Sequence, residues 1–197
     1  MKNKEKAFTL VEIMVAVAIL VIIISMLGPL FNSITKSSKA TQDTNNLDLN
    51  VGKTIEIYKR AVRNSKSFTT TFGGVTGVGI YLADNNGDKV SGTTARAIVI
   101  NVPKESTTTS GSFLDEKVIF YYNTTEQALY INSTTTTSGN FSTVTGETLL
   151  VNDVLNAEFG YQQKIATIYL KVQTDNDDSN KFKEIKDAAV TRINMDF

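Results

Sequence analysis

The chain has 197 residues, of which 41% are hydrophobic and 20% charged, a composition that suits one domain of ordinary size with an appendage. Its 20 basic and 20 acidic residues give a formal net charge of zero, so the overall charge does not favour nucleic acid as a partner. The sequence has no cysteine and no histidine, which excludes disulfides, thiolate zinc sites, cysteine nucleophiles and imidazole bases. We therefore predict no enzymatic activity and, apart from a candidate calcium site considered below, no cofactor.

The N-terminus combines a short basic head with a long apolar run. Lysines occupy positions 2, 4 and 6, and the only charge in the run that follows is Glu12. A helix over residues 13–35 would rise about 1.5 Å per residue, which is enough to cross the roughly 30 Å core of a bilayer. Basic residues that flank a membrane helix stay on the cytoplasmic side. We therefore predict a single-pass segment in the cytoplasmic membrane with the C-terminal part outside.

Two ordinary explanations of this segment are less satisfactory. A cleaved secretory signal has an A-x-A match at residues 16–18, but cleavage there would leave a further apolar run on the product and a charge at Glu12 before the site. A plain membrane anchor leaves Glu12 unexplained, because an acidic side chain costs about 2.5–3.5 kcal/mol at the centre of a spanning helix. Glu12 is therefore expected to have a partner.

The residues around this charge carry a specific resemblance. Ala7-Phe8-Thr9-Leu10-Val11-Glu12, followed by the apolar run, resembles the class III signal of type IV prepilins and type II secretion pseudopilins. In that family, prepilin peptidase cuts on the cytoplasmic side just before the phenylalanine and methylates the new amine. The resemblance implies a leader of residues 1–7 and a cut between Ala7 and Phe8. Most members have glycine before the cut, so Ala7 is a departure that bears on the rate of processing.

The predicted cut also has a physical rationale. It removes three lysines and one glutamate, and with them the cytoplasmic charge that anchors the helix. The new Phe8 amine and Glu12 lie four residues apart, on one helix face. In an apolar environment each charge needs the other, so we predict an ion pair between Glu12 of one subunit and the Phe8 amine of its neighbour. Phe8 and Glu12 are the predicted assembly residues.

Gly28 and Pro29 lie inside residues 8–35, the predicted transmembrane and polymerisation half of the helix. Proline removes one backbone hydrogen bond and clashes with the preceding turn, so a kink or local unwinding is expected there. In the resembled pilins, the corresponding region melts when subunits pack into the filament. The alternative is an ordinary kink of a membrane helix.

Residues 36–68 continue as the predicted amphipathic half of the helix. Apolar residues recur there at steps of three and four, which places them on one face. Polar residues occupy the opposite side, as expected for a helix laid along a sheet. Residues 36–46 are weakly patterned and Gly52 interrupts, so bending or fraying is expected in that zone. The apolar stripe consists of Leu47, Val51, Ile55, Tyr58 and Val62, and the polar side of Asn46, Lys53, Lys59, Arg60 and Arg63.

Residues 69–197 are predicted to form a β-rich globular head. The alternation in residues 165–173 is typical of a half-buried antiparallel sheet, whose apolar face needs a cover. The amphipathic helix can supply that cover, which predicts an α+β fold, the ladle of type IV pilins. Seven strands are predicted: Val78–Leu82, Ala97–Val102, Lys117–Asn123, Ala128–Asn132, Thr148–Asn152, Ile165–Gln173 and Val190–Phe197.

Two acidic clusters are candidate metal sites. Residues 84–88 have oxygen ligands at alternate positions, but an Asn-Gly hairpin turn explains them better than a calcium loop. Asp175, Asp177 and Asp178 lie between two late strands, where some pseudopilins hold calcium, and they otherwise form a solvated turn. These three residues are the candidate calcium ligands.

The resemblance implies a structural function, that of a minor pilin of the J or W kind in a type IV pilus. The implied partners are other pilin subunits, prepilin peptidase, the cytoplasmic membrane and the pilus assembly platform, and the implied destination is a pilus or pseudopilus at the cell surface. The alternative within the family is a pseudopilin of a type II secretion or DNA-uptake machine. Outside the family, the alternatives are an uncut membrane-tethered binding module and a secreted enzyme.

Overall fold

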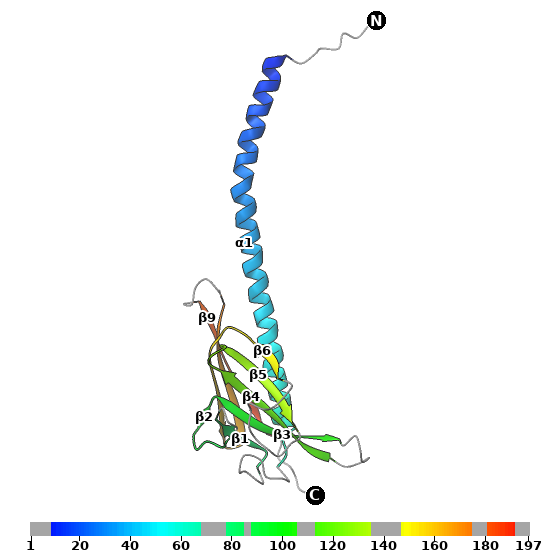
Figure 1. Ribbon diagram of the computed structural model, residues 1–197, viewed down its shortest axis with the longest axis vertical. Helices are drawn as coiled ribbons and strands as arrows, with labels where there is room; N and C mark the ends of the chain where they lie inside the picture. Colours follow the sequence, from blue (N-terminus) through cyan, green and yellow to red (C-terminus); the bar gives the residue numbers. More distant parts are fainter. Residues whose placement is uncertain are drawn as a thin grey trace. The chain divides into compact units, whose positions relative to one another are not determined.

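The computed structural model describes residues 9–67, 78–84, 88–105, 113–134, 147–174 and 181–191 (Figure 1). The chain divides into two compact units, Met1–Thr44 and Asn45–Phe197, which are described separately. The elements are α1 Leu10–Arg63, β1 Ile80–Ala83, β2 Thr94–Ala95, β3 Ala97–Glu105, β4 Phe113–Asn123, β5 Ala128–Thr134, β6 Thr148–Val151, β7 Val154–Gln162, β8 Ile165–Gln173 and β9 Phe182–Val190.

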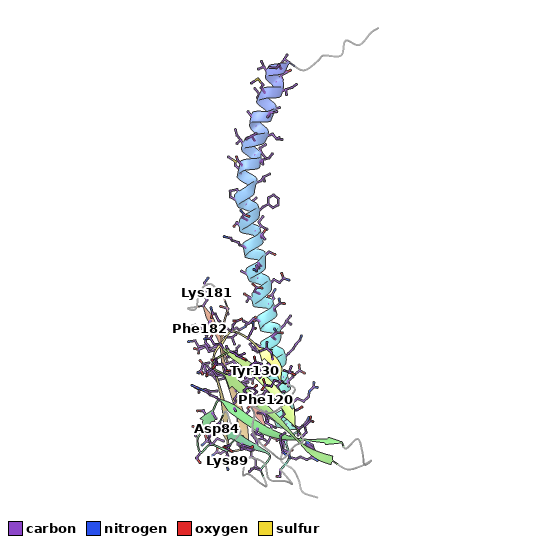
Figure 2. The ribbon with its side chains drawn as sticks, in the orientation of Figure 1. Asp84, Lys89, Phe120, Tyr130, Lys181 and Phe182 are labelled. Carbon is purple, nitrogen blue, oxygen red and sulfur yellow. The ribbon has the colours of Figure 1, made fainter. Side chains whose placement is uncertain are left out.

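The described part of the first unit is the N-terminal part of α1. Every large apolar side chain from Leu10 to Ile34 is exposed, with exposed fractions of 40–75%, and Figure 2 shows these side chains on all sides of the helix. By length and composition this helix can cross a membrane. Its helical conformation is unbroken at Gly28 and Pro29. Unwinding there on assembly stays a prediction.

In the second unit, the last part of α1 packs through the predicted stripe. Val51, Tyr58 and Val62 are buried, and Leu47 and Ile55 are partly buried against the same core. The stripe is therefore confirmed. The helix also continues through Gly52, where no neighbouring atom would obstruct a side chain.

Two antiparallel sheets make up the rest of the second unit. The strand order is β1-β3-β4-β5-β6 in the five-stranded sheet and β2-β7-β8-β9 in the four-stranded sheet. The α+β class and the antiparallel pairing are confirmed, but the strands divide between two sheets rather than forming one. A second buried cluster lies on the other face of the five-stranded sheet, formed by Tyr81, Ala83, Ala97, Val99 and Ile119.

Tyr58 joins the helix to both sheets. Its ring centroid lies 5.4 Å from that of Phe120 in β4 and 5.9 Å from that of Phe159 in β7. Its hydroxyl donates a hydrogen bond to the Thr167 carbonyl in β8 at 3.1 Å. All three rings are fully buried, and Phe120 is labelled in Figure 2. The three aromatic side chains therefore hold helix and sheets around one core.

The strand predictions succeeded where apolar residues alternate. Ile165–Gln173 coincides with β8, and β1, β3, β4, β5 and β6 overlap their predicted segments with shifted ends. The short β2 and the long β7 were missed. The predicted strand Val190–Phe197 shares only Val190 with β9, and residues 192–197 lie outside the described part of the chain.

β9 was missed because charged side chains occupy positions that face the helix. Lys183 Nζ lies 2.8 Å from Asp48 Oδ1, and Lys59 Nζ lies 2.6 Å from Asp187 Oδ2. Asp48 and Lys59 both belong to α1, so the helix neutralises the inward charges of this strand. Within the described residues β9 pairs on one side only, with β8. Inward-pointing charges on such an edge strand also oppose pairing with other chains.

We expect Asp187→Asn to lower the free energy of unfolding at pH 7 by at most about 1 kcal/mol, because the ion pair with Lys59 is partly exposed. The hydrogen bond from Lys59, with a further one from the Ala188 backbone amide, holds the pKa of Asp187 below its ordinary value. The pair therefore stabilises the fold above the unfolded-state pKa, and that contribution is lost as the pH falls through the lower folded-state pKa.

Denaturation of wild type and variant across pH 2–7 measures this effect. The two curves should converge as the pH falls through the lowered folded-state pKa of Asp187, because the carboxyl is then protonated in both states. A stability difference that stays constant down to pH 2 would show that the charge of Asp187 is not what matters.

Candidate functional site

The start of α1 is organised by a reciprocal pair of side chains. The backbone amide of Thr9 donates a hydrogen bond to Glu12 Oε2 at 2.8 Å, and the Thr9 hydroxyl donates to the same oxygen at 3.0 Å. In return, the backbone amide of Glu12 donates to Thr9 Oγ1 at 3.3 Å. Thr9 is the residue before the helix and Glu12 is its third residue, so the two form a capping box.

This capping box determines where the Glu12 carboxylate lies. It satisfies backbone amides that the first helical turn leaves without partners, and it places a negative charge at the positive end of the helix dipole. Both hydrogen bonds that the carboxylate accepts from Thr9 go to Oε2. Within the isolated subunit, Glu12 therefore has a local role in addition to any role between subunits.

Below the capping box, Glu12 borders an apolar hollow on the surface of the helix. Ile13, Ala16, Val17 and Leu20 line the hollow together with Glu12. These residues recur at intervals of one, three and four, so they share one helix face. Ala16 is small and leaves space beside larger neighbours. The arrangement offers an apolar surface with a carboxylate at its N-terminal edge, which suits another helix that carries a positive charge.

The structure describes only some of the predicted site residues. Glu12 lies in the first turn of α1, and Gly28 and Pro29 lie within the helix. Ala7 and Phe8 lie outside the described residues, so the cleavage and assembly geometry of these two positions stays a prediction. Thr9 was missed as a functional residue, although Thr-x-x-Glu before an apolar run is itself a sequence signal for a capping box.

The candidate calcium ligands Asp175, Asp177 and Asp178 also lie outside the described residues. They belong to the connection between β8 and β9, whose flanks are joined by a hydrogen bond from the Thr174 amide to the Lys181 carbonyl at 2.9 Å. In the parts of the chain that the structure describes, no group of three or more Asp or Glu side chains could hold a metal ion.

The other acidic cluster lies where the chain reverses after β1. The Asp84 amide donates to the Asp88 carbonyl at 3.0 Å, and the Asp88 amide donates to Asp84 Oδ1 at 3.0 Å. The strand pairing continues beyond them as a bridge between Ala83 and Lys89. These contacts agree with the predicted turn, whose central residues 85–87 are not described.

Comparison with known proteins singles out the same end of the chain. Residues 2–28 match the family model described as the prokaryotic N-terminal methylation motif. The comparison with curated proteins found no match, and neither did the comparison with solved structures. The matched range contains the predicted cut between Ala7 and Phe8, both members of the capping box, and Gly28. The resemblance drawn from the N-terminal residues is therefore confirmed for that segment.

Proposed function

We propose that this chain, which carries the class III prepilin signal at residues 2–28, is a minor pilin-like structural subunit of a type IV pilus. The observation that carries the proposal is the position of Glu12, a carboxylate in the first turn of a helix whose large apolar side chains from Leu10 to Ile34 are all exposed. A surface of that kind is stable only in a bilayer or among other helices.

A broader function, that of a pilin-like protein, is supported by the motif alone. The N-terminal methylation motif supports a type IV pilin-like protein that prepilin peptidase processes and that assembles with other pilins. Together with the apolar helix, the motif indicates a protein that is anchored in the inner membrane before assembly. The pilin family is structural rather than enzymatic.

In the proposed cycle, the chain is first held with its basic head in the cytoplasm and its β-rich unit outside. Cleavage between Ala7 and Phe8 removes the lysines and makes extraction from the membrane easier. The Phe8 amine of one subunit then pairs with Glu12 of its neighbour, and the hollow beside Glu12 receives part of the neighbouring helix. Unwinding at Gly28 and Pro29 would adapt the helix to this packing.

The size and the architecture of the β-rich head favour a minor pilin over a major subunit. Cleavage would leave 190 of the 197 residues, more than many major subunits have. The two-sheet unit that follows the helix also agrees with an elaborated subunit. A pseudopilin of a type II secretion or DNA-uptake machine would use the same cleavage and the same ion pair. Deletion of the genes for each machine in the native host distinguishes such a pseudopilin from a pilus subunit.

We expect the chain isolated from cells with active prepilin peptidase to begin at Phe8 and to carry a methylated amine. Intact mass spectrometry of the membrane-bound and filament fractions measures this directly. Ala7→Gly should give the same N-terminus at a higher rate, because glycine is the residue that the family mostly has before the cut. A chain that still begins at Met1 in such cells would instead identify an uncut, membrane-tethered module.

A further inference from the structure

Residues 36–46 form a polar part of α1 that lies between the apolar span and the part that packs on the core. All of these residues are exposed, on every face of the helix. Burial against the head begins only at Leu47, and the adjacent Asp48 forms an ion pair with Lys183 of β9. A helix that is polar all round gains nothing from packing and depends on its own backbone hydrogen bonds, which are marginal over so few turns in water.

The residue types in this segment also favour turns and caps over helix interiors. Seven of the eleven residues in KSSKATQDTNN are serine, threonine, asparagine or aspartate. Two threonine hydroxyls donate to backbone carbonyls one turn earlier, Thr41 to Ser37 at 2.9 Å and Thr44 to Ala40 at 2.9 Å. Such bonds slightly destabilise and bend helices.

Signals for a helix end and for a new helix start bracket the segment. Lys36 and Lys39 follow the apolar span, where basic side chains favour a helix C-terminus. Asn45 and Asn46 are good N-cap residues, and Asp48 would then lie in the first turn of a second helix. In the continuous helix, neither asparagine acts as a cap.

We infer that residues 36–46 are a conformational joint, in which α1 alternates between the continuous helix and two helices separated by an extended connection. The second helix begins at Asn45 or Asn46 and stays attached to the head through Asp48 and the buried stripe. Extension of the joint lengthens these residues from about 16 Å to at most about 40 Å. The head can then change its distance from the membrane while the span and the core keep their structures.

Distance measurement between spin labels tests this, and the absence of native cysteine makes the labelling selective. One full-length double variant, Thr35→Cys with Leu49→Cys, brackets the joint. The control, Leu49→Cys with Arg63→Cys, has the same sequence separation inside the second helix. All three positions are exposed. A continuous helix places both pairs about 21 Å apart along its axis.

In lipid nanodiscs, the control pair should give one narrow distribution, and the pair across the joint should add a second population at longer distances. Asn45→Ala with Asn46→Ala should reduce that population at least threefold, because it removes the caps and favours the helix. Asn45→Ser with Asn46→Ser, which keeps capping side chains, should retain it.

Two results would contradict the proposal that residues 36–46 form a joint. One is a single narrow distribution near 21 Å for both pairs, and the other is an alanine pair that behaves like the serine pair. The measurement uses the membrane-inserted chain before assembly, so it does not depend on cleavage or on filament formation. Failure of the pilin assignment and failure of the joint are therefore distinguishable.

Discussion

Glu12→Gln is expected to leave the protein inserted in the membrane and to reduce its incorporation into filaments by roughly two orders of magnitude or more. Glutamine can keep the capping interaction with Thr9, but it has no charge to pair with the Phe8 amine of a neighbour. Removing one partner of a buried ion pair costs about 3–5 kcal/mol, because the remaining charge is left without compensation. The ratio of filament to membrane protein, measured by immunoblot of sheared and cell fractions, reports the effect.

Three further variants separate the two roles of Glu12. Glu12→Ala removes both the cap and the charge, and it should be at least as defective as Glu12→Gln. Thr9→Ala removes the capping hydroxyl at a cost of about 1 kcal/mol and should be incorporated far better. Glu56→Gln changes an exposed carboxylate elsewhere on α1 and should behave as wild type. Normal incorporation of Glu12→Gln would refute the ion pair, and a larger defect in Thr9→Ala would assign the function to the cap.

The second large effect is expected in the core of the head. Tyr58→Ala should destabilise the unit Asn45–Phe197 by about 3–5 kcal/mol, because it removes a fully buried ring that contacts Phe120 and Phe159. For a unit of this size, the midpoint of thermal unfolding should fall by roughly 6–20 °C. Circular dichroism of the full chain in nanodiscs, followed at the β-sheet band, measures it.

Tyr58→Phe is the matched control for that substitution. It keeps the ring and loses only the hydrogen bond to the Thr167 carbonyl, so the loss of stability should be about 1 kcal/mol. If Tyr58→Ala unfolds within 2 °C of wild type, the helix does not hold the two sheets together through this side chain. If the phenylalanine and alanine variants are equally unstable, the hydroxyl rather than the ring is decisive.

Local chemistry explains why the N-terminal methylation motif could be recognised from the sequence. The cleavage motif, the uncharged run and Glu12 are contiguous, so their spacing alone indicates a membrane helix and a processing site. Thr9 could have been identified in the same way, since its partner Glu12 is three residues away. All the residues on which such a local motif depends are close together in the sequence, so the motif can be recognised without the tertiary structure.

Regular periodicity likewise identified the helix stripe and β8. Alternation of apolar and polar residues is sufficient for a strand with one buried and one solvated face, as residues 165–173 show. β7 departs from that pattern because a register shift between Val154 and Asn156 interrupts its pairing with β8. The shift moves side chains between faces, so a period of two does not hold along the strand.

Only the tertiary structure decided how the head is built. The division into two sheets depends on which strands pair, and alternation in a strand does not specify its neighbour. β9 depends on contacts between residues far apart in sequence, Lys183 with Asp48 and Asp187 with Lys59. A charged residue at a core-facing position makes a strand difficult to predict unless the residue with which it forms an ion pair is known. The sequence by itself determined the membrane helix, its signal and its packing stripe, because these are local, whereas the strand pairing and the neutralised charges arise from long-range contacts.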